Sequence, residues 1–167
     1  MAKGIYDLYL EYTDLKDLIN DVAVRFREDP VFKYEKKGIK TEITYERFKN
    51  DIDGFGTYLF SKGFNGDKKI AVLGENSYEW LLVYFAVLGS GNTAVPLDRD
   101  LPVDDILYNV TNSESGAIFF SPVYKDVPES LKELQSGIED YFPMADIYDM
   151  IAEGRKLIEA GDNSFKN

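Results

Sequence analysis

Apolar residues recur every three or four positions along residues 14–28, which is the spacing that one face of an α-helix produces. Thr13 stands where a capping residue would begin this helix, and Asp29 with Pro30 stands where it would end. The first element is therefore predicted to be an amphipathic helix. Its apolar stripe consists of Leu15, Leu18, Ile19, Val22, Ala23 and Phe26.

Two short runs rich in β-branched and aromatic residues, 31–36 and 39–44, follow on either side of Lys37 and Gly38. Two such runs around a short glycine-containing turn are typical of a β-hairpin. We therefore expect an antiparallel pair of strands directly after the first helix.

A second helical stripe begins after Thr44, the expected cap, and ends at Gly63. Gly54 and Gly56 lie inside it, and each costs about 1 kcal/mol relative to Ala in a helix interior. We therefore expect the middle of this helix to be its weakest part. Its stripe consists of Phe48, Ile52, Phe55 and Leu59.

Beyond residue 68, short continuously apolar runs alternate with helical segments. Strands that are apolar on both faces and alternate with helices indicate a parallel sheet covered on both sides. The predicted fold class is α/β: a partly parallel sheet of βα units, preceded by the hairpin and two helices. The expected strands are 69–73, 93–95, 117–120 and 138–142, and the expected helices run up to 88, from 102 to 110, over 128–134 and over 146–160.

Several boundaries in this second half follow from single residues. Asn76 and Glu79 are the expected capping pair of the helix that ends at residue 88. Pro96 is expected to end the second strand, and Pro102 to be the first residue of the next helix. Trp80 begins the longest apolar run and is expected to be buried. That run is far shorter than the ~20 residues that cross a bilayer.

The composition fits one soluble globular domain, because the 167 residues are 44% hydrophobic and 29% charged. The 30 acidic and 19 basic residues give a formal charge of -11, which opposes binding to nucleic acids and to anionic lipid. The amino terminus lacks the apolar core of a signal peptide. We therefore expect a cytoplasmic protein with no nucleic-acid partner and no transmembrane segment.

Residue chemistry alone gives no activity. The sequence has no Cys and no His, which excludes thiol chemistry, disulfides, Cys/His zinc sites and Ser-His-Asp catalysis. Residues 73–77 lie between a strand and a helix, where a phosphate could bind. This segment has one Gly, no Lys and an acidic Glu75, so we interpret it as a capped turn. Residues 89–91 are interpreted as a helix end.

The remaining polar clusters are assigned to structure. Four acids near two prolines are expected to be solvated in a loop and at a helix start, rather than to bind Mg²⁺ or act as acid and base. Two lysine pairs are assigned to a turn and a strand start, and four tyrosines to packing. These residues are Asp98, Asp100, Asp104 and Asp105; Lys36, Lys37, Lys68 and Lys69; and Tyr9, Tyr12, Tyr34 and Tyr45.

An ordered series of short motifs covers residues 44–120. Each is weak alone, but their order and spacing together resemble the amino-terminal region of the adenylate-forming acyl-CoA synthetase superfamily. Residues 95–102, Val-Pro-Leu-Asp-Arg-Asp-Leu-Pro, look most like bacterial long-chain fatty-acid–CoA ligases. The motifs are Thr44-Tyr45, the Gly-Phe-Asn-Gly-Asp turn at 63–67, Asn76-Ser77 before its apolar helix, the Gly-x-x-x-Val-Pro-Leu stretch at 91–97, Leu101-Pro102, Tyr108 and the strand entry at 113–117.

This resemblance implies a fold, a reaction and cofactors. Residues 1–160 would be an incomplete piece of the family's large amino-terminal domain, and residues 161–167 a truncated linker. The parent enzyme would use ATP and Mg²⁺ to convert a fatty acid to an acyl-adenylate, and would then transfer the acyl group to CoA. The helix around 151–157 looks like the family's approach to its nucleotide loop.

The family's catalytic loop, rich in Ser, Thr and Gly and ending in Pro-Lys-Gly, does not occur in the sequence. No catalytic, cofactor-binding or metal-binding residue of the family can be assigned to any position here. The resemblance thus implies an inactive fragment that needs no cofactor itself, whose partner is the remainder of the ligase chain. An exposed sheet edge would allow a homo-oligomer to form.

Two other functions remain open. The parent could be another carboxylate-adenylating enzyme, such as a peptide-synthetase adenylation domain or an aryl-CoA ligase. Alternatively, the chain could be a non-enzymatic interaction module built on the same scaffold.

Overall fold

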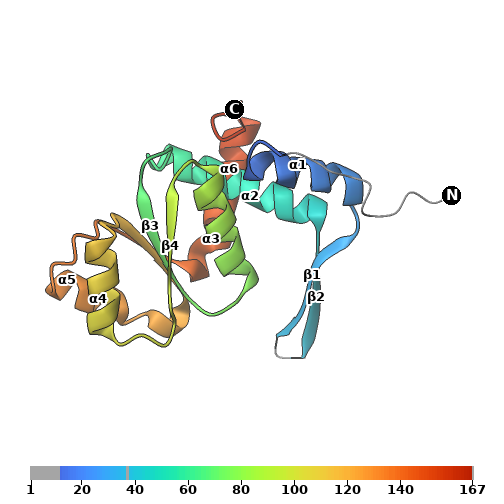
Figure 1. Cartoon of the computed structure of the whole chain (residues 1–167). Coiled ribbons are helices and arrows are strands. Elements are labelled where there is room, and N and C mark those ends of the chain that lie inside the picture. The colour runs from blue at the N-terminus through green and yellow to red at the C-terminus, as the bar shows by residue number, and fades with distance from the viewer. Residues whose placement is uncertain (1–11, 37, 167) are drawn as a thin grey trace.

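The computed structural model describes residues 12–36 and 38–166 (Figure 1). A helix, a hairpin and a second helix precede four parallel strands, each of which is followed by a helix. In chain order the elements are α1 (Leu15–Phe26), β1 (Pro30–Lys36), β2 (Ile39–Thr44), α2 (Tyr45–Ser61), β3 (Lys69–Leu73), α3 (Tyr78–Gly89), β4 (Thr93–Leu97), α4 (Val103–Asn112), β5 (Ala117–Phe120), α5 (Val127–Glu133), β6 (Asp140–Pro143) and α6 (Ile147–Glu159).

The four-stranded sheet has the order β4-β3-β5-β6, and all of its neighbours are parallel. The chain passes from β3 to β4 in one direction and then crosses back over β3 to reach β5. The direction of connection therefore changes between β3 and β5. Open α/β sheets bind ligands at such a point, outside the carboxyl ends of the strands. The α/β fold with its preceding hairpin is confirmed.

Two apolar cores lie on the two faces of the sheet. Alternate residues of β3 point to opposite faces, so Ile70 and Val72 belong to one core, and Ala71 and Leu73 belong to the other. The first core is covered by α1, α2, α3 and α6, and the second by α4 and α5. Figure 1 shows the hairpin β1–β2 projecting from this body below α2.

The glycines of α2 and α6 allow these two helices to come into backbone contact. A Cβ atom built on Gly154 would lie 1.8 Å from the carbonyl oxygen of Gly54. A Cβ atom on Gly56 would lie 2.3 Å from the ring of Phe165. The expectation that glycine weakens the middle of α2 misses this role, because α2 is continuous over Tyr45–Ser61 and its glycines are buried.

Two predicted helix caps are wrong by one residue. Asp14, not Thr13, caps α1, because the backbone N–H of Asp17 donates to Asp14 Oδ1 at 2.9 Å. Ser77, not Asn76, caps α3, because its hydroxyl oxygen accepts from the N–H of Trp80 at 3.1 Å. In both cases two adjacent side chains are able to cap a helix, and the backbone direction decides between them.

The prolines and the last strand require further corrections. Pro96 does not end β4 but lies within it, opposite Val72; proline is tolerated there because β4 is an edge strand. Pro102 is the cap of α4 rather than its first residue. The last strand, β6, begins at Asp140 instead of residue 138, since Ile138 packs into the second core before the strand starts.

The residues after α6 return to the body of the protein. Phe165 is only 2% exposed, and its ring meets that of Phe60 edge to face with 5.9 Å between centroids. The Lys16 ammonium donates to the carbonyl oxygen of Phe165 at 3.0 Å and also lies over the ring of Phe165. The domain boundary after residue 160 stays a prediction, but part of the segment beyond it is anchored.

Within residues 12–36 and 38–166, no helix combines the length and the apolar character that crossing a bilayer requires.

Candidate functional site

A pocket of about 1080 Å³ lies where the carboxyl ends of β3, β5 and β6 face the hairpin. The loops after these strands supply Glu75 to Ser77, Ser121 to Val123, and Met144 with Ala145. Strand β1 supplies the opposite wall. The pocket thus occupies the edge of the sheet at which its order reverses, the usual place for a ligand in this architecture.

The floor of the pocket contains a hydroxyl group that has no hydrogen-bond partner among the described residues. Ser121, the first residue after β5, is 5% exposed, and its Oγ atom is buried and unpaired. A Cβ atom on Gly74 would lie 3.2 Å from the Cβ of Ser121, 3.3 Å from Trp80 and 3.4 Å from Met144. Glycine at position 74 therefore allows the two strand ends to pack closely together.

Aromatic side chains form the walls. Phe32 and Tyr34 come from β1, Tyr78 and Trp80 from α3, and Tyr148 from α6. Trp80 is half-buried rather than buried as expected, because its ring lines the pocket. The Trp80 ring also stacks on that of Tyr84 with 5.3 Å between centroids.

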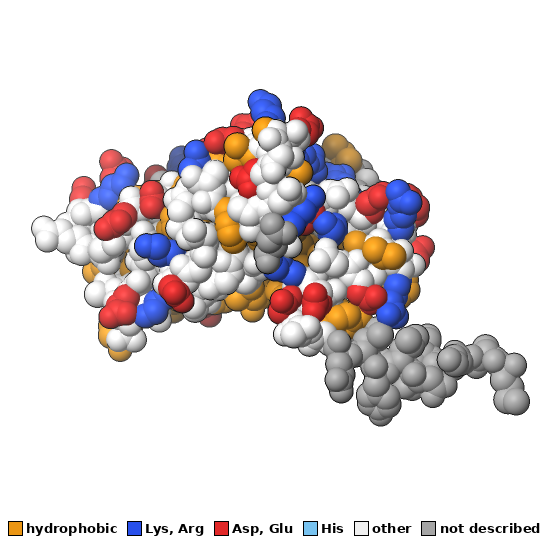
Figure 2. All heavy atoms as spheres, turned by 90° about the horizontal axis from the view of Figure 1, so that it is seen from above, with side chains coloured by type: hydrophobic (Ala, Val, Ile, Leu, Met, Phe, Trp, Pro, Cys, Tyr) orange, Lys and Arg blue, Asp and Glu red, His pale blue; other side chains and the backbone are white. Residues whose placement is uncertain are grey.

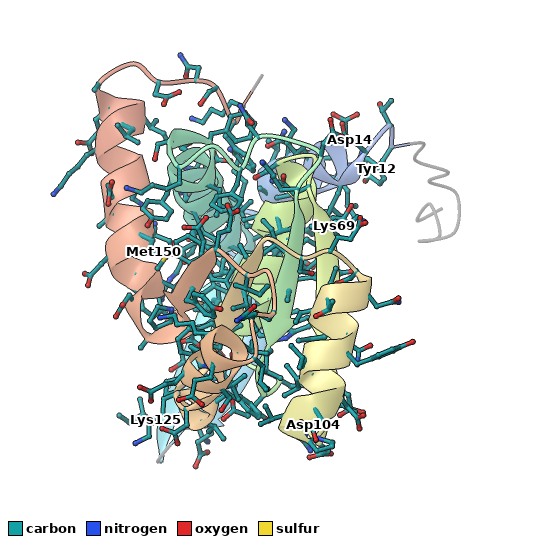
Figure 3. All side chains as sticks on the ribbon, turned by 90° about the vertical axis from the view of Figure 1, so that its left-hand side faces the viewer. Tyr12, Asp14, Lys69, Asp104, Lys125 and Met150 are labelled. Carbon is teal, nitrogen blue, oxygen red and sulfur yellow. The ribbon has the colours of Figure 1, made fainter. Side chains whose placement is uncertain are left out.

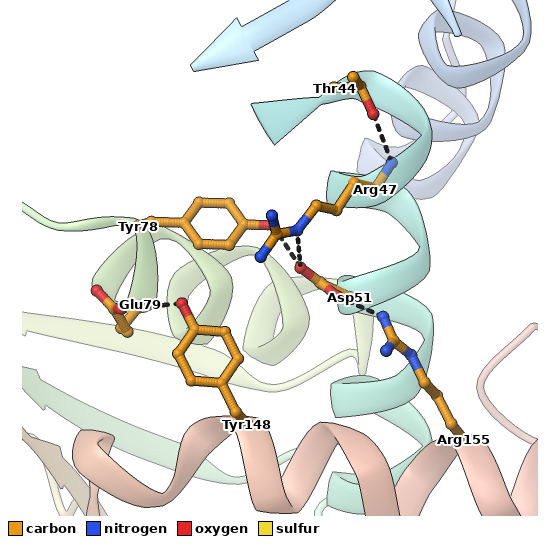
Figure 4. A network of polar contacts seen from close by, with 7 residues as sticks. All are labelled: Thr44, Arg47, Asp51, Tyr78, Glu79, Tyr148 and Arg155. Atoms are coloured by element: carbon orange, nitrogen blue, oxygen red, sulfur yellow. Dashed lines mark hydrogen bonds and ion pairs between the residues drawn. The ribbon is translucent and has the colours of Figure 1, made fainter. Parts of the chain in front are cut away.

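One tyrosine on the wall is held by a carboxylate. The hydroxyl of Tyr148 donates to Glu79 Oε1 at 3.0 Å (Figure 4). Partial burial, and then the negative charge of Glu79, raise the pKa of Tyr148 above the usual value for tyrosine. This hydroxyl therefore stays protonated at neutral pH and acts as a hydrogen-bond donor.

Behind the wall lies a buried carboxylate that joins three helices (Figure 4). Asp51 of α2 is 4% exposed; it accepts from the hydroxyl of Tyr78 at 2.8 Å and from Arg155 Nη2 at 2.5 Å. Arg47 Nε lies 3.6 Å from the same carboxylate. Burial, and then Asp51, raise the pKa of Tyr78. The network fixes α2, α3 and α6 relative to one another beside the pocket.

The segments considered as sites from the sequence have structural roles. Residues 73–77 form a capped turn, although their last three residues line the pocket. The four acids Asp98, Asp100, Asp104 and Asp105 are exposed, as expected. Asp104 lies in the first turn of α4, on the outside of the protein (Figure 3). Among the described residues, no group of three or more His, Cys, Asp or Glu side chains is placed to hold a metal ion.

Lys69, Tyr12 and Tyr45, from the basic pairs and the tyrosines, also have local partners. Lys69 Nζ lies 2.7 Å from Glu114, and the hydroxyl of Tyr12 donates to Asp21 at 2.6 Å. Tyr45 packs against Phe26. Figure 2 shows acidic and basic side chains interspersed over one face of the protein. Tyr9 and Lys37 lie outside the described residues.

The sequence patterns do not identify Ser121 as a pocket residue. The available signal is its position, since it directly follows an apolar strand of a parallel sheet. That signal is easily overlooked because Ser121 belongs to no recognised motif.

Comparison with protein families matches residues 19–161 to the family described as AMP-binding enzyme. A long-chain-fatty-acid–CoA ligase 1 of Cavia porcellus is 28% identical over 123 residues, which cover 71% of this chain and 17% of that protein. A polypeptide of the mycosubtilin synthase of Bacillus subtilis is 25% identical over 107 residues, covering 64% of this chain and 4% of that protein.

Among solved structures, a long-chain-fatty-acid–CoA ligase from Archaeoglobus fulgidus superposes with a TM-score of 0.77 at 16% identity. The match covers 88% of this chain and 31% of that one. This likeness concerns the fold. In all three comparisons the chain spans well under half of its relative's length.

Proposed function

Because the chain belongs to the AMP-binding enzyme family, we propose that it is the amino-terminal scaffold of a long-chain fatty-acid–CoA ligase. The parent enzyme activates a fatty acid with ATP and Mg²⁺ to an acyl-adenylate, and CoA then displaces AMP. The observation that carries this proposal is the family match over residues 19–161, together with the similarity to the Cavia porcellus ligase. The motif at residues 95–102 also supports a fatty-acid substrate.

In this proposal the chain contributes architecture rather than chemistry. Its sheet, covered on both faces, supplies part of the large amino-terminal domain, and residues 161–167 connect that domain to the remainder of the parent enzyme. The remainder of the ligase chain is its partner, and it carries the groups that bind ATP, Mg²⁺ and CoA. The isolated chain is therefore inactive. The cytoplasm, where ATP and CoA are abundant, is its proposed location.

A second candidate parent is a peptide-synthetase adenylation domain, and the similarity to the mycosubtilin synthase polypeptide supports it. Both parents form an acyl-adenylate, so the first half-reaction is common to them. They differ in the carboxylate that is activated and in the thiol that accepts the acyl group.

Exchange of labelled pyrophosphate into ATP tests the proposal, because this exchange reports adenylate formation. We expect the product of the whole gene to catalyse exchange with palmitate and not with the amino acids, and the 167-residue chain to catalyse none. Exchange that depends on an amino acid would favour the second parent. Exchange catalysed by the 167-residue chain would contradict its role as a scaffold.

We also propose that the isolated chain associates with itself through the edges of its sheet. Within the described residues, strands β4 and β6 each have one neighbour in the four-stranded sheet, so each presents one open side. The formal charge of -11 repels a second copy, and salt screens that repulsion. Sedimentation velocity is expected to show dimers or larger species that increase with protein and salt concentration. A strictly monomeric chain at high concentration in high salt would refute this.

A further inference from the structure

We propose that the pocket at the carboxyl ends of β3, β5 and β6 binds a planar small molecule whose nitrogen-bearing polar group is neutral or cationic, with Ser121 as its hydrogen-bonding partner. The proposal does not depend on the identity of the parent enzyme.

The first support is the unpaired hydroxyl. A buried polar group without a hydrogen bond costs about 1–3 kcal/mol, and most such groups in proteins are satisfied. The Oγ atom of Ser121 is buried at the floor of the pocket, and no described residue hydrogen-bonds to it. A ligand that reaches the floor would supply the missing hydrogen bond.

The second support is the position of this hydroxyl. Ser121 lies after β5 and Gly74 lies after the neighbouring strand β3, on the two sides of the point where the sheet order reverses. A side chain at position 74 would crowd Ser121, Trp80 and Met144. Glycine at position 74 thus allows these three residues, all of which line the pocket, to pack closely together.

The third support is the shape and character of the walls. Phe32, Tyr34, Tyr78, Trp80 and Tyr148 come from three separate elements and all line the same space. Aromatic walls favour a flat ligand, which stacks on them, and their electron-rich faces attract a cationic group. With about 1080 Å³ the pocket also has room for a molecule larger than one ring.

The charges around the pocket determine the sign of the charge that its ligand can carry. The acids Glu35 and Glu79 line it, and the ammonium of its lining residue Lys33 is already paired with Glu42 at 2.9 Å. Arg47, whose charge acts on Tyr148, is paired with Asp51. A carboxylate or phosphate group would therefore be repelled, and a cation would be attracted. This distinguishes the site from one for a carboxylate substrate.

Three isosteric probes test this directly: benzamidine, which is cationic, benzamide, which is neutral, and benzoate, which is anionic. Trp80 is the only tryptophan of the sequence and lines the pocket, so its emission reports binding without a label. In the 167-residue chain, we expect benzamidine to bind most tightly, benzamide less tightly, and benzoate about tenfold or more weakly than benzamidine. Added salt should reduce the difference between benzamidine and benzoate.

Two variants connect binding to the floor of the pocket. Ser121→Ala should weaken benzamidine binding about fivefold or more while the chain keeps its unfolding midpoint, because a small side chain replaces the hydroxyl. Ser164→Ala, at an exposed position on the segment after α6, should change neither. The proposal is overturned if no probe alters Trp80 emission, if benzoate binds as well as benzamidine, or if Ser121→Ala binds like the unchanged chain.

Discussion

Gly154 is the residue on which the packing of α2 against α6 depends most directly. Its Cα approaches the backbone of Gly54 so closely that even one additional methyl group would overlap with the Gly54 carbonyl oxygen. Glycine costs helix stability at this position, but the contact between the two helices requires it.

We therefore predict that Gly154→Ala destabilises the chain by about 2–4 kcal/mol, although Ala is the better helix former. Urea unfolding followed by circular dichroism measures this. The matched control is Gly116→Ala, since a Cβ there meets no described atom within 4 Å. A Gly154→Ala chain as stable as the Gly116→Ala chain would show that α2 and α6 do not pack as described.

Tyr78 makes the stability of the fold depend on pH in the alkaline range. Burial, and then the neighbouring Asp51, raise its pKa in the folded state above the value of about 10 for an unfolded tyrosine. The contribution of Tyr78 to the free energy of unfolding is therefore complete below pH ~10. It is lost as the pH rises further, by up to about 1.4 kcal/mol per pH unit.

The free energy of unfolding, measured between pH 8 and pH 11, should fall above pH ~10 in the unchanged chain and less steeply in Tyr78→Phe. Tyr108→Phe, at a position that is 66% exposed, serves as the control and should keep the full slope. Equal slopes in all three proteins would mean that Tyr78 is not buried beside Asp51.

At the scale of single elements, only one of two adjacent polar residues caps α3. Ser77 accepts a hydrogen bond from the N–H of Trp80, whereas the side chain of Asn76 is exposed. Ser77→Ala is expected to cost about 1 kcal/mol and Asn76→Ala much less. Urea unfolding of the two variants provides the comparison. A larger loss of stability for Asn76→Ala would show that Asn76, the residue expected from the sequence, caps α3.

The elements themselves can be predicted because their signals are local. The stripe through Phe48, Ile52 and Phe55 and the apolar run of β3 depend on spacing along the chain alone. The helix caps, Pro96 and the glycines depend on what lies opposite them in space. The sequence does not reveal that β4 is at an edge, so Pro96 resembles the end of a strand. The glycines of α2 resemble weak points because their partners lie about a hundred residues away, in α6 and at Phe165.

The candidate site can be predicted only in outline, for the same reason. The alternation of strands and helices indicates a parallel sheet, and a parallel sheet has a ligand-binding edge. Ser121 and Gly74 meet there only because β3 and β5 are neighbours, although β4 and α4 separate them in the sequence. Strand order is a property of the whole fold, and residue patterns do not encode it.

At the scale of the whole molecule, Phe165 connects the end of the described chain to its beginning. Its ring lies in a space that Gly56 and Gly89 leave free, and its backbone accepts from Lys16 of α1. Removing a buried phenylalanine ring costs about 3–5 kcal/mol in other proteins.

We predict a loss of this size for Phe165→Ala and a much smaller one for Phe26→Ala, because Phe26 is 45% exposed. Thermal unfolding of the two variants under identical conditions makes the comparison. If both variants unfold at the same temperature as the unchanged chain, residues 161–167 behave as a free linker and Phe165 does not anchor them.

The most direct test of the scaffold proposal is the nucleotide sequence of the source gene beyond the codon for Asn167. We predict an open reading frame that continues and encodes, within a few tens of codons, a loop rich in Ser, Thr and Gly that ends near Lys-Gly. That loop would supply the phosphate-binding chemistry of the parent enzyme. A stop codon directly after Asn167, with no such loop, would contradict the ligase parent and leave a non-enzymatic module on the same fold.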